Sequence, residues 1–426
     1  MPTIELIKNL RLGKMDLIQY LNEICDLIES KDPDIKALVS DTFDREQIIQ
    51  QGRHLLKKYP EPEKRPALFG VPIGVKDIFR VDGFPTRCGS ALPASLFEGQ
   101  EASCVTQLKQ AGVIILAKTV TTEFAFFEPG PTRNPHRLEH TPGGSSSGSA
   151  AGVASGFFPL ALGSQTVGSI IRPAAYCGIV GFKPSAERIS KEGVIPFSQT
   201  ADHVGLFCKD IDSINMCMSL FDTNWNNESP PAEMRFGIPV GPYLDQATDE
   251  VLKHFQQHIG GFKNSGQQII EIPMFDDFQT IHDHHHLMTA AEKARYHAPW
   301  FEQYREVYRP RTREWIERGQ TIENETLNAY RQEGLALRNK IHDVMVDNDI
   351  DAWLCPSTLD TPSKGLDSTG SPAMNLPWTS AGLPAISLPS GFNDQGLPFG
   401  LQVVASFNQD ERLLSISKRL AKLLSK

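Results

Sequence analysis

Long apolar runs and a surplus of basic charge are both missing from this sequence of 426 residues. No stretch approaches the roughly 18 uninterrupted apolar residues that a membrane-spanning helix needs. The amino terminus, Met-Pro-Thr-Ile-Glu, lacks the basic start and apolar segment of a secretory signal. With 42 basic and 51 acidic residues the net charge is −9, whereas a nucleic-acid binder needs a basic face to neutralise phosphates. We therefore expect no membrane partner and no nucleic-acid partner.

Paired cysteines are also missing. The seven cysteines are an odd number, they are widely scattered, and no two are spaced as Cys-x-x-Cys. This pattern argues against a disulfide framework and against a zinc site, and it is typical of a reducing compartment. We therefore expect a cytoplasmic protein.

Predicted strands and helices alternate along the chain, which is typical of an α/β layered fold. β-branched and apolar segments predict strands at 71–79, 113–118, 178–182, 352–355, 385–388 and 400–404. Apolar residues at three- and four-residue spacing predict helices within 1–60, over 276–348 and over 410–424. There is no internal repeat and no strong domain break, so we expect one large domain.

Glycine and serine crowd the stretch 141–149. A flexible linker has this composition, but the apolar segment 150–162 that follows must be buried, which does not fit a linker. A phosphate-binding loop would need a Gly-Lys-Ser/Thr sequence that this stretch lacks. A Gly-x-Ser-x-Gly nucleophile turn with Ser146 at its centre matches formally, but it would need a late histidine base, and no histidine follows His342.

A second loop of small residues, 163–173, follows, and its Ser169 lies 24 positions after Ser145 (169 − 145 = 24). Lys76 precedes both serines within the predicted strand 71–79. This chain order resembles the amidase signature family, in which a lysine and a second serine replace histidine. Further segments similar to that family lie at 70–77, 121–125, 174–184, 193–196, 372–377, 382–385 and 396–402, so the resemblance covers essentially the whole chain.

The resemblance implies a serine amidohydrolase that uses neither a metal nor an organic cofactor. Ser169 would be the nucleophile, Ser145 would relay its proton, and Lys76 would be the terminal acid and base. A lysine acts as a base only when it is neutral, so its usual pKa of about 10.4 must fall by roughly 2–3 units. The apolar strand around Lys76 favours this shift, and the adjacent Asp77 should point to the opposite side of the strand.

Backbone N–H groups of the second loop are expected to stabilise the tetrahedral intermediate. The family forms this oxyanion hole at the positions that are here Thr166, Val167, Gly168 and Ser169. Ser146 is expected to support the first loop as a hydrogen-bond partner.

The second loop departs from the family pattern, which commonly reads Asp-x-Gly-Gly-Ser-x-Arg-x-Pro. This chain has Gln165 in place of the acid, Val167 in place of a glycine, and Arg172 one position later than usual. The loss of the acid removes a charged anchor of the turn. We therefore expect a loop with its own packing and an unaffected nucleophile.

The resemblance also implies the amidase signature fold, a single large domain (1–426) with a mixed β-sheet covered by helices. We expect N-terminal helices at 1–60, a catalytic core at 61–222, a variable and mostly helical substrate region at 223–345, and a C-terminal return to the core at 346–426. The similarity is weakest between 225 and 345, where substrate selectivity should reside.

The candidates for substrate contacts are Glu123, Phe124, Tyr296 and Trp300. The segment His282–His286 contains a His-x-x-x-His pair that would share one helix face. The family chemistry needs no metal and no second ligand cluster is evident, so we assign no metal site.

The predicted reaction is hydrolysis of the C–N bond of a small carboxamide, with release of ammonia or an amine. The alternative is a glutaminase subunit of an amidotransferase assembly, which would deliver ammonia to a partner. Many members of the family are dimers, so a homodimer is compatible with the sequence.

Overall fold

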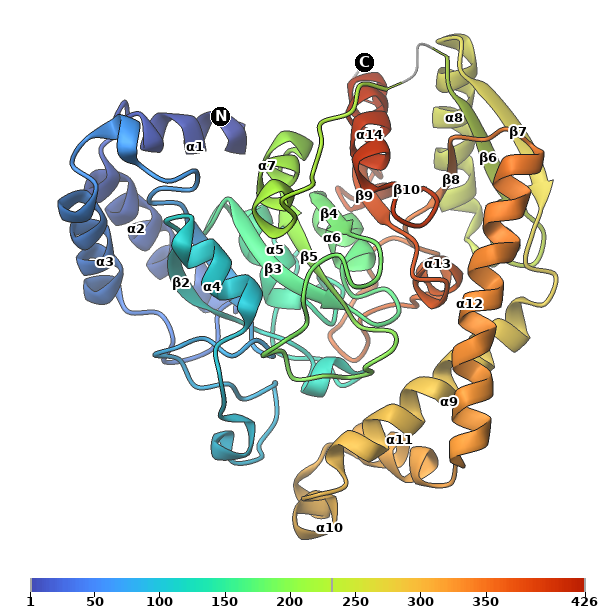
Figure 1. The fold of residues 1–426 in the computed structure, drawn as a ribbon, viewed down its shortest axis with the longest axis horizontal. Helices are drawn as coiled ribbons and strands as arrows, with labels where there is room; N and C mark the ends of the chain where they lie inside the picture. Colours follow the sequence, from blue (N-terminus) through green and yellow to red (C-terminus); the bar gives the residue numbers. More distant parts are fainter. Residues whose placement is uncertain (1, 231–232, 425–426) are drawn as a thin grey trace.

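One mixed β-sheet of ten strands runs through the computed structural model, which describes residues 2–230 and 233–424 (Figure 1). The strand order is β2-β1-β3-β5-β4-β9-β10-β8-β6-β7. The pairs at the two ends of this order are parallel, and the pairs from β3 to β8 are antiparallel. The strands are β1 (Pro72–Lys76), β2 (Ile114–Thr119), β3 (Leu160–Gln165), β4 (Val180–Lys183), β5 (His203–Cys208), β6 (Arg235–Val240), β7 (Gln268–Pro273), β8 (Ala352–Pro356), β9 (Ala385–Phe392) and β10 (Pro398–Val404). The predicted α/β class with a mixed sheet is confirmed.

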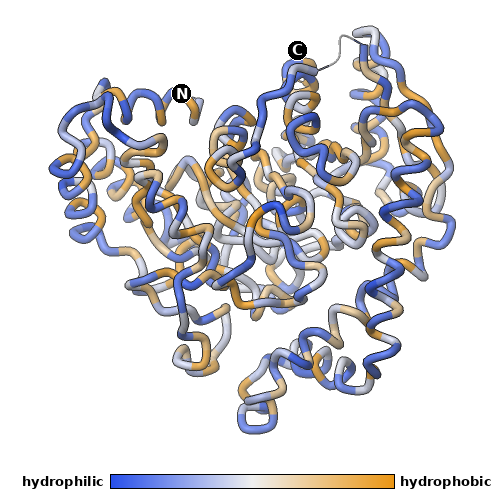
Figure 2. Tube along the Cα trace, viewed as in Figure 1, coloured by the Kyte–Doolittle hydropathy of each residue, from blue (hydrophilic) through white to orange (hydrophobic). Residues whose placement is uncertain are grey.

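Helices cover the sheet and extend beyond it (Figure 1). They are α1 (Thr3–Arg11), α2 (Leu17–Ile35), α3 (Arg45–Lys58), α4 (Ser103–Gln110), α5 (Ser147–Ser155), α6 (Ile171–Cys177), α7 (Ile211–Phe221), α8 (Asp249–Asn264), α9 (Phe278–His297), α10 (Phe301–Tyr304), α11 (Pro310–Gln320), α12 (Asn324–Asp347), α13 (Leu376–Ser380) and α14 (Asp410–Leu424). α5 packs on β1 to β3, α6 packs on β4, β9 and β10, and α9 packs on α11 and α12. Figure 2 shows hydrophilic and hydrophobic residues alternating along the outer helices, as expected when one face meets the core. No helix in the described ranges is long and apolar enough to cross a membrane.

Most of the predicted elements are present, but four strands lie outside the predicted ones. The six predicted strands correspond to β1, β2, β4, β8, β9 and β10, and the predicted helix 410–424 is α14. The helices predicted within 1–60 are α1, α2 and α3. Gly13 at φ +68° follows the end of α1, and the Asp16 carboxylate accepts the Gln19 N–H at the start of α2. β3, β5, β6 and β7 lie outside the predicted strands, and the last two extend the sheet from within residues 223–345.

The Gly/Ser-rich stretch 141–149 is buried and is not a linker. It leads into α5 and then β3, both of which lie in the core. A Cβ on Gly148 would lie 2.1 Å from the carbonyl oxygen of Ala37 and 2.4 Å from the backbone nitrogen of Val120. Only glycine fits this close approach, which explains one of the glycines of the stretch.

Candidate active site

Lys76 is the last residue of β1, and its side chain is fully buried. Its Nζ lies 2.7 Å from the Oγ of Ser145 and 2.8 Å from the Oγ of Ser164. Two of the three predicted catalytic side chains are therefore in hydrogen-bond contact, and Ser164 of β3 joins them. Ser164 lacks a distinguishing sequence signal, because serine is common in loops of small residues.

The surroundings of Lys76 favour a neutral amine. Burial lowers the pKa of Lys76 from 10.5 to about 7, against smaller contributions from Asp202 and Cys88 that raise it. The neighbouring Asp77 pairs instead with Lys118 of β2, at 2.8 Å, as expected for adjacent residues on opposite sides of a strand. Near neutral pH a large fraction of Lys76 is therefore uncharged and has a lone pair.

The loop that carries Ser145 is held from two sides. The Gly144–Ser145 peptide bond is cis. From α6, the guanidinium of Arg172 donates to the carbonyl oxygen of Gly144 at 2.7 Å. The hydroxyl of Ser146 donates to the carbonyl oxygen of Ser164 at 3.2 Å and thus joins the loop to β3. The supporting role of Ser146 in catalysis stays a prediction.

Ser169 lies in the turn between β3 and α6, with 8% of its surface exposed. The side chain of Gln165 holds this turn, since its Oε1 accepts the N–H groups of Ile170 and Ile171 at 2.8 and 3.0 Å. Its Nε2 donates to Thr379 at 2.9 Å. A neutral amide thus anchors the turn where the family commonly has an acid, which explains how the substitution is accommodated.

The predicted oxyanion-hole residues, 166–169, form one continuous turn. Their backbone N–H groups donate to no acceptor within the described ranges. The other groups of Thr166 are occupied, because its carbonyl oxygen accepts from His285 at 3.0 Å and its hydroxyl donates to Asp202. The turn is held by its side chains and carbonyls while its N–H groups are free to meet a developing negative charge.

Asp202 is a site residue that the sequence does not reveal. Its carboxylate also accepts the backbone N–H groups of Phe197 and Ser198, at 2.8 and 3.1 Å. It is buried, and burial raises its pKa above the usual range. An isolated aspartate in a polar stretch is usually exposed, so only the fold shows that this one contacts the turn at 166–169.

Three of the four predicted substrate contacts come together in one aromatic cluster. The ring centroid of His297 lies 4.6 Å from that of Phe124 and 5.7 Å from that of Trp300. Tyr296 lies 5.4 Å from Trp300. The cluster joins the segment after β2 to the end of α9.

The fourth predicted contact, Glu123, is buried and already has partners. Its carboxylate accepts the hydroxyl of Ser90 at 3.0 Å and the backbone N–H of Arg309 at 3.1 Å. These contacts hold the segment after β2 against the start of α11. Glu123 therefore has a structural position next to the aromatic cluster.

The histidine-rich segment supports the second loop. The Nε2 of His285 lies 3.0 Å from the carbonyl oxygen of Thr166, while the Nδ1 of His284 lies 2.5 Å from a carboxylate oxygen of Glu333. In the part of the chain that the structure describes, no three His, Cys, Asp or Glu side chains are grouped so that they could hold a metal ion.

Comparison with known proteins decides the family. A family model described as Amidase matches residues 19–414. The chain belongs to the amidase family. One relative of this amidase-family chain is a glutamyl-tRNA(Gln) amidotransferase subunit of Chlamydia pneumoniae, which is 28% identical over 97% of the chain and 93% of its own length. The protein of the same name from Prochlorococcus marinus is 30% identical over 93% of this chain and 92% of its own length.

Solved structures agree with this assignment. A crystal structure described as an amidase superposes on the chain with a TM-score of 0.91 and 28% identity, covering 99% of both chains. The peptide amidase of Stenotrophomonas maltophilia, at 20% identity, has the same fold with a TM-score of 0.84. The predicted amidase signature fold is confirmed, and the chain is an amidase-family enzyme.

Proposed function

We propose that this enzyme hydrolyses the C–N bond of a small carboxamide through a serine acyl-enzyme. The observation that supports it most is the fully buried Lys76, with its Nζ 2.7 Å from Ser145 and a pKa lowered to about 7. A neutral amine accepts the proton of the Ser145 hydroxyl while it donates to Ser164. Ser145 in turn takes the proton of Ser169, which makes Ser169 a nucleophile.

Attack of Ser169 on the amide carbonyl forms a tetrahedral intermediate with a negatively charged oxygen. The free N–H groups of residues 166–169 are the donors that stabilise this charge. Loss of one such donor typically costs about 100- to 1,000-fold in kcat. Gln165 and Asp202 fix the turn, so the donors need little rearrangement when the charge develops.

The proton then returns along the same path. Lys76, now charged, gives its proton through Ser145 to the leaving nitrogen, the C–N bond breaks, and ammonia or an amine leaves. Water then attacks the acyl-enzyme, the relay accepts the proton of the water, and Ser169 recovers its hydrogen as the acid is released. Each proton that Lys76 takes up is given back within the same half-reaction.

Ammonia release from a panel of primary amides tests the proposal. Ser169→Ala should lower kcat by at least about 1,000-fold, because nucleophile and relay act as a unit. Ser155→Ala, at the end of α5, is the matched control and should retain the activity. Full activity in the Ser169→Ala variant would refute the assignment.

A second candidate is a glutaminase subunit of an amidotransferase assembly. The curated relatives favour it, since they are named as subunits of a glutamyl-tRNA(Gln) amidotransferase and match the chain over nearly its full length. The same chemistry would then act on glutamine, and the ammonia would pass to a partner. Rapid ammonia release from simple amides by the purified chain alone supports the stand-alone enzyme. Release from glutamine that rises only when an associated protein is added supports the amidotransferase.

A further inference from the structure

A second buried lysine, Lys293 of α9, lies near the candidate active site and has no part in the proposed relay. Its side chain is fully buried, and its Nζ donates to the carbonyl oxygen of Phe124 at 3.1 Å. The Nζ also lies 4.2 Å from the ring centre of Phe197. An ammonium has three N–H donors, and only one of them has a partner within residues 2–230 and 233–424.

Lys293 lies between the two loops of the site. On one side, Phe124 is two residues from Thr122, whose N–H donates to the carbonyl oxygen of Ser145 at 3.3 Å. On the other side, the N–H of Phe197 donates to Asp202, which holds the oxyanion turn. Asp202 also acts electrostatically on both Lys293 and Lys76, so the two amines share one environment.

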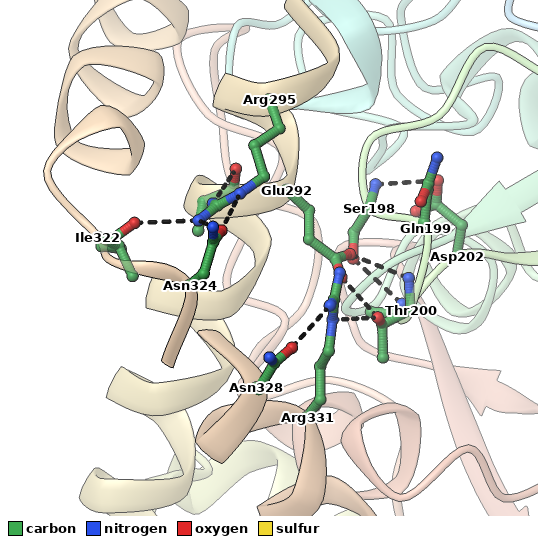
Figure 3. A network of polar contacts seen from close by, with 12 residues as sticks. Ser198, Gln199, Thr200, Asp202, Glu292, Arg295, Ile322, Asn324, Asn328 and Arg331 are labelled. Carbon is green, nitrogen blue, oxygen red and sulfur yellow. Dashed lines mark hydrogen bonds and ion pairs between the residues drawn. The ribbon is translucent and has the colours of Figure 1, made fainter. Parts of the chain in front are cut away.

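Glu292, the residue before Lys293 on α9, is held by a network of polar contacts (Figure 3). The Glu292 carboxylate accepts the hydroxyl of Ser198 at 2.5 Å and the backbone N–H of Thr200 at 2.9 Å. From α12, Arg331 donates to the same carboxylate at 2.6 Å. α9 is therefore bound to the loop that carries Phe197, which keeps the backbone at Lys293 beside that loop.

The carboxylates near Lys293 are committed to other donors. Asp202 accepts from Thr166 and from two backbone N–H groups, and Glu123 accepts from Ser90 and Arg309. Neither forms an ion pair with Lys293 in the described structure. A buried ammonium without a counter-ion is costly, so the amine readily loses its proton, and an anionic group supplied from outside the chain would stabilise its charged form.

One turn further along α9, His297 adds a second unsatisfied group. Its Nδ1 lies 2.9 Å from the hydroxyl of Tyr308, and its Nε2 is buried without a hydrogen-bond partner among the described residues. Lys293 and His297 are four residues apart and so lie on the same helix face. The ring of His297 packs against Phe124, which is the residue that Lys293 contacts.

We propose that Lys293 determines substrate specificity by binding a carboxylate on the amide substrate. The inference rests on the proposed amide hydrolysis and names its substrate class: small carboxamides that carry a carboxylate at the end opposite the amide. A desolvated ammonium–carboxylate pair is strong and directional, and a neutral amide of the same length would leave the ammonium unpaired. Glutamine and the monoamides of dicarboxylic acids belong to this class.

The pH dependence of the wild-type enzyme provides a test that needs no variant. Burial lowers the pKa of Lys293 to about 7, and the groups that face it are Glu123, Asp202 and Cys88, which raise its pKa, and His297. Lys76 must be neutral for catalysis, whereas Lys293 must be charged to bind a carboxylate. For glutaramate, the monoamide of glutaric acid, kcat/KM should be bell-shaped around pH 7. For pentanamide, which has the same length without the carboxylate, kcat/KM should rise to a plateau.

Lys293→Met provides the second test. We expect kcat/KM for glutaramate to fall by roughly 30-fold or more, mainly through KM, and kcat/KM for pentanamide to stay within about 3-fold. Lys340→Met, on the surface of α12, is the control and should change neither value.

Equal loss for both substrates in a folded Lys293→Met variant would overturn the inference and indicate a structural lysine. The same conclusion follows if wild-type pH profiles for the two substrates coincide. Failure of the proposed hydrolysis itself is distinguishable, because the enzyme would then release no ammonia from pentanamide either.

Discussion

The guanidinium of Arg172 lies 2.7 Å from the carbonyl oxygen of Gly144, so the second loop of small residues holds the first loop in place. A further nitrogen contact joins Arg172 to the carbonyl oxygen of Gly370 at 2.8 Å. The arginine is fully inside the protein and has carbonyl oxygens as its partners. Its displacement by one position from the family pattern therefore leaves a working contact to the residue before Ser145.

Arg172→Met should lower kcat by about 10- to 100-fold with little change in KM, because a buried carbonyl without a donor costs about 1–3 kcal/mol and Ser145 loses its fixed position. Steady-state ammonia release with a neutral amide measures both constants. Arg313→Met, a surface residue of α11, is the control. A change in KM alone would show that Arg172 acts on binding and not on the relay.

The side chain of Gln165 is neutral, but its three hydrogen bonds should make it important for the stability of the protein. Gln165→Leu removes three hydrogen bonds from a buried turn and should lower the free energy of unfolding by about 2–4 kcal/mol, with kcat reduced as well. Gln165→Glu keeps the acceptor for Ile170 and Ile171 and loses only the donor to Thr379, so its loss should be smaller. Urea unfolding of the wild type, Gln165→Leu and Gln165→Glu measures the three free energies of unfolding. Equal destabilisation by both substitutions would contradict the assigned contacts.

Removal of the negative charge at Asp202 should shift the activity profile. Asp202 raises the pKa of Lys76, so Asp202→Asn should lower this pKa further and move the rising limb of kcat/KM to lower pH. The asparagine oxygen can accept the N–H groups of Phe197 and Ser198 while its amide nitrogen donates to the hydroxyl of Thr166, which preserves the turn. The measurement is kcat/KM for pentanamide between pH 5 and 9, and a shift to higher pH would disprove the electrostatic role.

Stability should rise with pH above 7. The pKa values of Lys76, Lys183 and Lys293 are each lowered by burial from 10.5 to about 7. Between pH 7 and the unfolded value, the unfolded chain binds more protons than the folded chain, so each lysine adds at most about 1.4 kcal/mol per pH unit to the free energy of unfolding. Below pH 7 these lysines are charged in both the folded and the unfolded state, so the folded state carries the full free-energy cost of burying their charges.

The clearest window for that measurement ends near pH 8.5, where cysteines of the unfolded chain begin to ionise and oppose the trend. Urea unfolding at pH 6.5, 7.5 and 8.5 should give increasing free energies. Lys293→Met should be more stable than the wild type at pH 6.5 and should show a shallower slope. A wild-type stability that falls across this window would contradict the lowered lysine pKa values.

The parts of the site that the sequence predicts are those that lie in short segments with a fixed order. Lys76 ends a strand, and Ser145 and Ser169 each lie in a loop of small residues just before a helix. Asp202 and Lys293 have no such local signal. Asp202 contacts Thr166 across 36 positions, and Lys293 contacts Phe124 across 169, so only the fold brings these groups together.

The missed strands have a related cause. The apolar stretch 150–162 is recognisable as buried, but a continuous apolar run does not show by its periodicity where α5 ends and β3 begins. β7 lies at the edge of the sheet and is only partly buried, so its apolar pattern is weak. β6 and β7 also belong to the region where the resemblance to the family is weakest.

The contact between Gly148 and Ala37 bears on the order of assembly. Ala37 is synthesised more than a hundred residues before Gly148, so the segment against which α5 packs leaves the ribosome before that helix does. A circular permutant that moves the segment around Ala37 to the carboxyl end would reverse the order in which the two segments are synthesised. In the permutant, helix formation should be as fast as in the wild-type chain, whereas hydrolytic activity should appear later than in the wild-type chain.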